Sequence, residues 1–146
     1  MPSSLCVIPA RGGSKRIEKK NIRPFLGKPI IAYSIQAALE CGCFEEVMVS
    51  TDDAAIATVA EQCGARVPFL RSARTASDFA GLADVLLEVL QQYRHRGRNP
   101  DILACVLATA PFVTSVDLRS AMEQIAEPRC DGVVSVCRFG YPIQRA

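Results

Sequence analysis

Between Ser4 and Cys137, four short apolar runs alternate with longer amphipathic stretches, and this alternation leaves few folds open to the chain. Each run is apolar almost continuously rather than at every second residue, a pattern typical of strands buried on both faces of a parallel sheet. We therefore predict four strands, SLCVIP, EEVMVS, ILACVLA and DGVVSVC, over residues 4–9, 45–50, 102–108 and 131–137.

The stretches between the runs place apolar residues three and four positions apart, as one face of an amphipathic helix requires. They predict helices within residues 28–42, 51–64, 81–96 and 115–126. Asp52 or Asp53 can cap the second helix, and Ser115 can cap the fourth. The inward face of the fourth helix is expected to comprise Leu118, Met122 and Ile125.

Strands and helices in regular alternation indicate an α/β fold, with a doubly wound, mostly parallel sheet and helices on both faces. A chain of 146 residues suffices for a single domain, residues 1–146, with one hydrophobic core. Ligands of such sheets bind beyond the carboxyl ends of the strands. The loop that follows the first strand, Ala10 to Asn21, is therefore the first candidate for a binding site.

The overall composition argues against several classes of protein. A formal net charge of +2 does not support a broad basic surface for nucleic acid. No apolar run is long enough to span a membrane, and the N-terminus does not resemble a signal peptide, so we expect a cytoplasmic protein. The seven cysteines form no C-x-x-C pair and His95 is the only histidine, so we expect reduced core thiols rather than disulfides or a zinc site.

Positive charge is concentrated in and after the first loop, where seven of the seventeen Lys and Arg residues lie within residues 11–28. Gly12 and Gly13 allow positive φ and let main-chain N–H groups face a ligand, while Arg11 and Lys15 add charge around them. We expect this loop to bind a polyphosphate, although its spacing matches neither a Walker A loop nor a G-x-G-x-x-G loop. The alternative is a turn followed by a solvated basic segment.

The sequence IPARGGSKRIEKKN, followed by GKPIIAYSI, resembles the signature of the acylneuraminate cytidylyltransferases, the CMP-sialic acid synthetase family. The resemblance continues through VMVSTDD, FLRSARTASDFAGLADVLLEVL and VLATAPF, and covers essentially the whole chain. The forms RSARTASDFA, ATAPF and YPIQRA are most similar to the pseudaminic acid branch. The resemblance implies a Rossmann-like nucleotide-diphospho-sugar transferase fold.

The resemblance also implies a reaction, in which CMP passes from CTP to the anomeric hydroxyl of a nine-carbon sugar acid and pyrophosphate is released for cell-surface glycan biosynthesis. Arg11 and Lys15 would be the catalytic residues. Binding of the nucleotide would fall to Ala10, Arg11, Gly12, Gly13, Ser14, Lys15, Lys20, Asn21, Arg71, Ser77 and Asp78. Binding of the sugar acid would fall to Ala108, Thr109, Ala110 and Pro111.

Three further expectations follow from the resemblance. Leu107 stands where the sialic acid enzymes carry the glutamine of LQPTSP, which favours a more deoxygenated sugar such as pseudaminic acid. The family uses Mg²⁺ and pairs two subunits as a homodimer, both through segments later than Ala146. We therefore expect the C-terminal part of the domain to be missing here, and the metal ligands to lie beyond Ala146. Asp52 and Asp53 could approach the water shell of a metal ion, but helix capping is their favoured role.

Several alternatives stay open. The sugar acid could be legionaminic, N-acetylneuraminic or 3-deoxy-manno-octulosonic acid. The chain could also be a nucleotide-binding module that keeps the fold without turnover. Arg71 and Asp78 could form only a surface salt bridge, and Lys19 and Arg23 could be solvated cations without a ligand.

Overall fold

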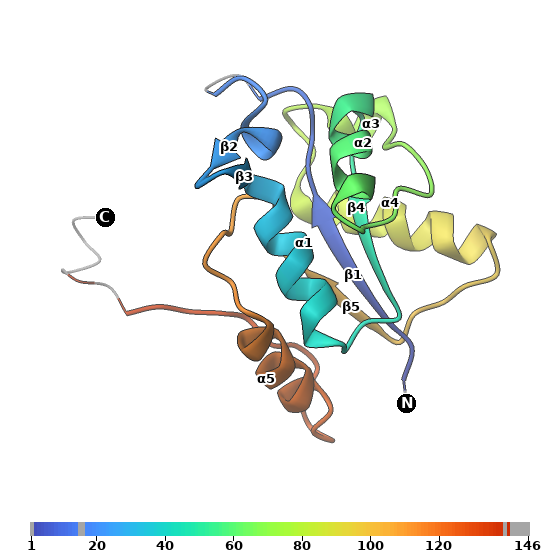
Figure 1. Ribbon diagram of the computed structural model, residues 1–146. Helices are drawn as coiled ribbons and strands as arrows, with labels where there is room; N and C mark the ends of the chain where they lie inside the picture. Colours follow the sequence, from blue (N-terminus) through green and yellow to red (C-terminus); the bar gives the residue numbers. More distant parts are fainter. Residues whose placement is uncertain (1, 15–16, 139, 141–146) are drawn as a thin grey trace.

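The chain is built around a sheet of three parallel strands. The computed structural model describes residues 2–14, 17–138 and 140. The strands are β1 (Ser4–Pro9), β4 (Glu46–Ser50) and β5 (Ile102–Cys105), in the order β4-β1-β5 (Figure 1). In the register of the sheet, Leu5 pairs with Glu46 on one side and with Leu103 on the other. The first three predicted strands are confirmed, although β5 ends three residues earlier than predicted.

Helices and short elements connect these strands. The helices are α1 (Ile30–Cys41), α2 (Ala54–Gln62), α3 (Ala73–Ala76), α4 (Leu82–His95) and α5 (Ser115–Ile125). The loop after β1 ends in a 3-10 helix, η1 (Lys20–Ile22), and β2 (Pro24–Phe25) pairs antiparallel with β3 (Lys28–Pro29). Within the described part of the chain, no helix has the length and apolar character that a membrane span requires.

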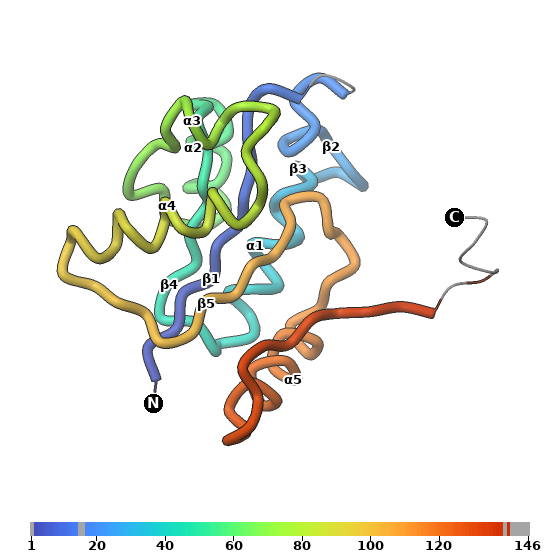
Figure 2. The backbone as a smooth tube through the Cα atoms, turned by 180° about the vertical axis from the view of Figure 1, so that it is seen from behind, coloured from blue at the N-terminus to red at the C-terminus, as the bar shows by residue number. Residues whose placement is uncertain are grey.

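Helices cover both faces of the sheet because successive side chains of β1 point to opposite sides. Cys6 and Ile8 are fully buried in a cluster with α1 and α2. Leu5 and Val7 are buried in a second cluster with α4. Figure 1 shows α1 in front of β1, and Figure 2, seen from behind, shows α4 on the other side. The predicted α/β fold with helices on both faces is confirmed.

The helix caps test the local predictions. Asp53 caps α2, as predicted, and its carboxylate accepts hydrogen bonds from two backbone N–H groups of the first turn. The prediction of Ser115 for α5 is wrong, because Thr114 is the cap: its hydroxyl accepts from the Asp117 N–H at 3.2 Å, and the Asp117 carboxylate accepts from the Thr114 N–H at 3.0 Å. The residue three places after Ser115 is Leu118, which cannot return such a bond.

The fourth predicted strand is wrong. Residues 131–137 run in an extended path away from the sheet (Figure 2), and the side chains of Val134 and Val136 are 81% and 90% exposed. A strand needs a neighbour for its backbone N–H and C=O groups, and none of the described strands pairs with this segment. The preceding helix, α5, packs on α1, but its predicted inward residues are only half-buried: Leu118, Met122 and Ile125.

Candidate functional site

A pocket of about 330 Å³ lies at the carboxyl ends of β1 and β5. Its wall is formed by Pro9 at the end of β1, by residues 107–109 after β5, and by parts of the segment 71–85 that leads into α4. The described part of the chain thus places a cavity at the edge of the sheet where ligands of such folds bind. Eight predicted site residues line it: Arg11, Lys20, Asn21, Arg71, Ser77, Asp78, Ala108 and Thr109.

Six other predicted site residues that the structure describes do not line this pocket. Ala10 is buried, and its backbone N–H donates to the Ser50 carbonyl at 2.9 Å, so it fixes the start of the loop. The remaining residues outside the lining are Gly12, Gly13, Ser14, Ala110 and Pro111. Lys15, predicted to be catalytic, lies outside the described residues.

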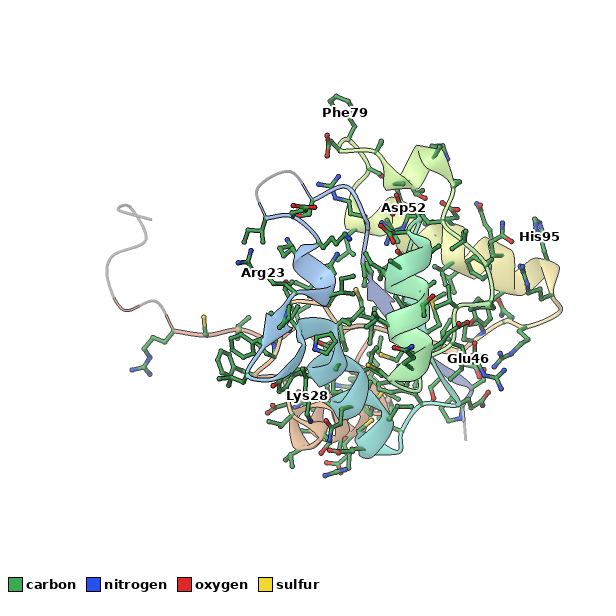
Figure 3. The ribbon with its side chains drawn as sticks, turned by 45° about the horizontal axis from the view of Figure 1, so that its top comes forward. Arg23, Lys28, Glu46, Asp52, Phe79 and His95 are labelled. Carbon is green, nitrogen blue, oxygen red and sulfur yellow. The ribbon has the colours of Figure 1, made fainter. Side chains whose placement is uncertain are left out.

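Gly12 occupies a place where no side chain fits. A Cβ at this position would lie 2.7 Å from Asp53 Oδ2 and 2.8 Å from Asp53 Cβ. The Gly12 N–H donates to Asp52 Oδ1 at 2.9 Å, and Figure 3 shows Asp52 near this loop. Neither Gly12 nor Gly13 has positive φ, so the expected use of glycine for such a conformation is wrong. Close packing against the cap of α2 is the reason for glycine at position 12.

Gly12→Ala should therefore distort the loop, and we expect it to lower the free energy of unfolding by about 1–3 kcal/mol, the usual cost of overpacking. Gly13→Ala is the matched control, because a Cβ there meets nothing within 4 Å, and we expect it to be neutral or stabilising by up to about 1 kcal/mol. Urea denaturation of both variants measures the difference. Equal effects of the two substitutions would show that packing against Asp53 does not require Gly12.

An ion pair between Arg11 and Asp78 joins two loops across the pocket. The distance from Arg11 Nη1 to Asp78 Oδ1 is 2.6 Å, and each side chain is 38% exposed. The sequence left open a surface salt bridge between Arg71 and Asp78, but Arg71 is buried and donates to Ser50. An arginine has five N–H donors in a planar fork, so the half-exposed Arg11 can hold Asp78 and still donate to an anion in the pocket.

Arg71 is buried beside the end of β4. Its residue exposure is 8%, its Nη2 donates to the Ser50 carbonyl at 2.6 Å, and its Nε donates to Ser50 Oγ at 3.1 Å. Burial lowers the pKa of Arg71 below its ordinary value, and the nearby carboxylates of Asp52 and Glu88 oppose that shift. Nη1 of Arg71 donates no hydrogen bond to any of the described residues.

Asn21 and Lys20 complete the basic side of the pocket from η1. Asn21 is 6% exposed and donates from Nδ2 to the Arg11 carbonyl at 3.0 Å, so it holds the loop closed behind Arg11. Lys20 is exposed and lines the pocket. The two residues therefore contribute differently: Asn21 fixes the backbone that presents Arg11, and Lys20 adds mobile positive charge.

The opposite wall follows β5. Ala108 is 3% exposed, and the backbone of Leu107 is fixed because its carbonyl accepts from Ser34 Oγ at 2.8 Å and from the Ala110 N–H at 3.2 Å. The Leu107 side chain lines the pocket and is 54% exposed. The wall therefore has an apolar leucine at the position where the sialic acid enzymes carry a glutamine.

Sequence reasoning missed Glu88, a buried carboxylate of α4. Its residue exposure is 7%, and it accepts hydrogen bonds from the Ser72 N–H at 2.8 Å, from Ser72 Oγ at 3.0 Å and from the Thr75 hydroxyl. The signal was present, because Glu88 lies three residues after Val85 on the inward stripe of the helix. A glutamate in that stripe is expected to have buried partners.

The remaining metal-ligating and thiol groups do not add to the site. Within the ranges that the structure describes, no group of three or more His, Cys, Asp or Glu side chains is placed to hold a metal ion. All seven cysteines are free, as predicted; Cys6 and Cys41 are buried and Cys63 packs against the core, whereas the prediction of core thiols is wrong for the exposed Cys105 and Cys137. Burial raises the pKa of the Cys6 thiol to about 12. His95 is exposed and lies at the C-terminal end of α4, remote from Asp52 (Figure 3).

Comparison with known proteins adds relatives to this geometry. A family model described as cytidylyltransferase matches residues 5–138. A pseudaminic acid cytidylyltransferase of Campylobacter jejuni is 42% identical over 143 residues, which cover 98% of this chain and 62% of that protein. A CMP-N,N'-diacetyllegionaminic acid synthase of Legionella pneumophila is 43% identical over 119 residues, 82% of this chain and 51% of that protein. The chain thus spans less than two thirds of the length of these relatives.

A solved structure shares the arrangement of strands and helices. CMP:2-keto-3-deoxy-manno-octonic acid synthetase, solved in complex with CTP, superposes with a TM-score of 0.73 at 25% identity. The match covers 86% of this chain and 48% of that one.

Proposed function

The chain belongs to the cytidylyltransferase family, and from this premise we propose that its pocket binds CTP for the transfer of CMP to a sugar acid. The observation that carries the proposal is the meeting of three cations at the carboxyl edge of the sheet: Arg11 and Lys20 from the loop after β1, and Arg71 from the segment before α3. A triphosphate is the strongly anionic ligand that such a cluster suits.

In the proposed reaction, the anomeric hydroxyl oxygen of the sugar acid attacks the α-phosphorus of CTP. A new oxygen–phosphorus bond forms as the bond from the α-phosphorus to the bridging oxygen breaks. The hydroxyl proton goes to solvent, and pyrophosphate leaves with the bonding electron pair. Arg11 and Lys20 would hold the β- and γ-phosphates and stabilise the charge that develops on the leaving oxygen. Catalysis would thus rest on positioning and on charges arranged in advance.

Pseudaminic acid is the sugar acid that we propose first. The 42% identity over nearly the whole chain to an enzyme named for it supports this choice. The apolar Leu107 in the wall also supports a sugar with fewer hydroxyl groups. A legionaminic acid is the second candidate, because a relative named for its diacetyl form is 43% identical over a shorter span.

We propose Mg²⁺ as a companion of the triphosphate. The described residues do not form a metal site of their own, because Asp53 caps α2 and Asp52 accepts the Gly12 N–H. Titration of CTP with and without magnesium tests whether the ion contributes to binding. We also propose a homodimer, which the family resemblance implies, and a cytoplasmic location.

The first test is calorimetric titration of the purified chain with CTP, UTP, ATP and GTP in the presence of magnesium. We expect CTP to bind at least about tenfold more tightly than the others, a difference that one or two base-specific hydrogen bonds supply. Pyrophosphate release with a panel of sugar acids then tests turnover. Tight CTP binding without product from any sugar acid would favour a binding module, and binding without preference among the nucleotides would contradict the proposal.

A further inference from the structure

A buried carboxylate in α4 anchors the segment that forms one wall of the pocket. Glu88 accepts hydrogen bonds from the backbone N–H and the hydroxyl of Ser72 and from the hydroxyl of Thr75. Both oxygens of Glu88 are used, and Thr75 is only 1% exposed. Burial by itself raises the pKa of Glu88, but the hydrogen bonds from Thr75 and Ser72 outweigh it and hold the pKa below its ordinary value, so the carboxylate is charged at neutral pH.

The anchored segment has little stability of its own. Its helix, α3, has only four residues, and an isolated helix of that length does not persist in water. Ser72 is the N-cap of α3, yet its side chain makes no capping hydrogen bond within the helix. The side chain and N–H of Ser72 are directed to Glu88 instead. The conformation of α3 therefore depends on a residue of another helix.

The same segment carries the side chains that face the pocket. Arg71 precedes α3, while Ser77 and Asp78 follow it, and all three line the cavity. Arg71 is tied to β4 through Ser50, and Asp78 is tied to Arg11. Anchors at β4 and at Arg11 hold the ends of the segment, and the Glu88 contacts hold its middle. Burial lowers the pKa of Arg71, and the Glu88 carboxylate opposes that shift, which means that it favours the charged guanidinium.

We propose that Glu88 is a positioning residue, which sets the placement of Arg71, Ser77 and Asp78 for the ligand through its bonds to Ser72 and Thr75; this inference rests on the proposed CTP site. Glu88 itself does not line the pocket. Its effect on binding must therefore pass through the segment 71–78. Loss of the contacts should loosen that segment while the sheet, whose strands are held by β1, stays ordered.

Two substitutions remove the contacts from either side. Glu88→Gln keeps the shape of the side chain but removes the charge and one acceptor oxygen, and Thr75→Val removes the hydroxyl at nearly constant volume. In each variant we expect the backbone amides of residues 71–78 to exchange with deuterium about tenfold faster, with β1 and β4 unchanged. For Glu88→Gln, whose side chain lies outside the pocket lining, we also expect CTP to bind about tenfold more weakly. In the double variant, the exchange rate of residues 71–78 should be close to that of one single variant, because both substitutions remove the contact between Thr75 and Glu88. Glu123→Gln, an exposed glutamate of α5, is the control and should change neither quantity.

The outcomes separate this inference from the proposed function. Unchanged exchange in residues 71–78 of both variants would overturn the anchoring role of Glu88. Faster exchange throughout β1 and β4 as well would also overturn it, because Glu88 would then support the whole fold and not the segment. Absence of CTP binding by the unmodified chain would overturn the proposed function and the effect on the ligand, whereas locally faster exchange in the variants would still establish the anchor.

Discussion

Arg11→Ala is expected to weaken CTP binding by roughly 10- to 150-fold, the loss that one charge-assisted hydrogen bond of about 1.5–3 kcal/mol represents. Arg11 lines the pocket with its side chain 38% exposed, and Asn21 fixes the backbone that presents it. The phosphates would lose this donor, but the base and ribose would not. Cytidine should therefore bind the variant as well as it binds the unmodified chain, and calorimetry with both ligands measures the two losses.

The control for Arg11 lies in the same basic segment. Arg23 is exposed and does not line the pocket, and Figure 3 shows it pointing away from the molecule. Arg23→Ala removes the same charge from the chain, so we expect less than about a twofold change in CTP affinity at physiological salt, where exposed charges are screened. If Arg23→Ala weakened CTP binding as much as Arg11→Ala, net charge and not the pocket would explain the effect. An equal loss for CTP and cytidine would contradict a phosphate role of Arg11.

Arg71→Ala is expected to lower the free energy of unfolding by about 2–4 kcal/mol, because it removes buried hydrogen bonds and leaves a cavity. Ser50 would lose the donors to its carbonyl and hydroxyl. Asp52 and Glu88 would lose the positive charge that lies near them. Urea denaturation at neutral pH measures the change, and CTP affinity should fall in the same variant because Arg71 lines the proposed site.

A second arginine of the same region serves as the comparison for Arg71. The backbone of Arg66 pairs with β4 through Val47 and Val49, but its side chain is exposed. Arg66→Ala should therefore change the free energy of unfolding by about 0.5 kcal/mol or less. Similar losses for both arginines would show that the buried contacts of Arg71 contribute little. Unchanged CTP affinity in Arg71→Ala would remove it from the nucleotide site.

Much of the fold was predictable because it depends on local patterns. The continuous apolar runs at Ser4–Pro9 and Glu46–Ser50 are strands, and α1 ends at Cys41, directly before Gly42, whose φ of 68° is typical of a glycine after a helix. The run at residues 131–137 is similarly apolar, but no strand lies beside it in the described chain, and it does not form a strand. An apolar pattern shows that a segment can pair, whereas the presence of a partner decides whether it does.

The candidate site was likewise predictable only in part. A basic glycine-containing loop after the first strand can be read from neighbouring residues, and it pointed to Arg11, whereas Lys20 and Asn21 were assigned to the site by the family resemblance. The partners of those side chains could not be read, because Arg11 and Asp78 are 67 positions apart in the chain. The sequence pointed to Gly12 for its backbone freedom, but glycine is required there because Asp53, at the start of α2, packs against it.

Local periodicity and the place of the basic loop were thus enough for the α/β fold and for the edge of the sheet where the site lies. The contacts within that site were set by the folded chain: Arg11 with Asp78, Arg71 with Ser50, and Glu88 with Ser72. The physical reason is that parallel strands bring the loops after their carboxyl ends to one edge, however far apart these loops are in the chain. Which side chains then meet depends on the packing of α2 and α4 against the sheet, and no short stretch of sequence contains that information.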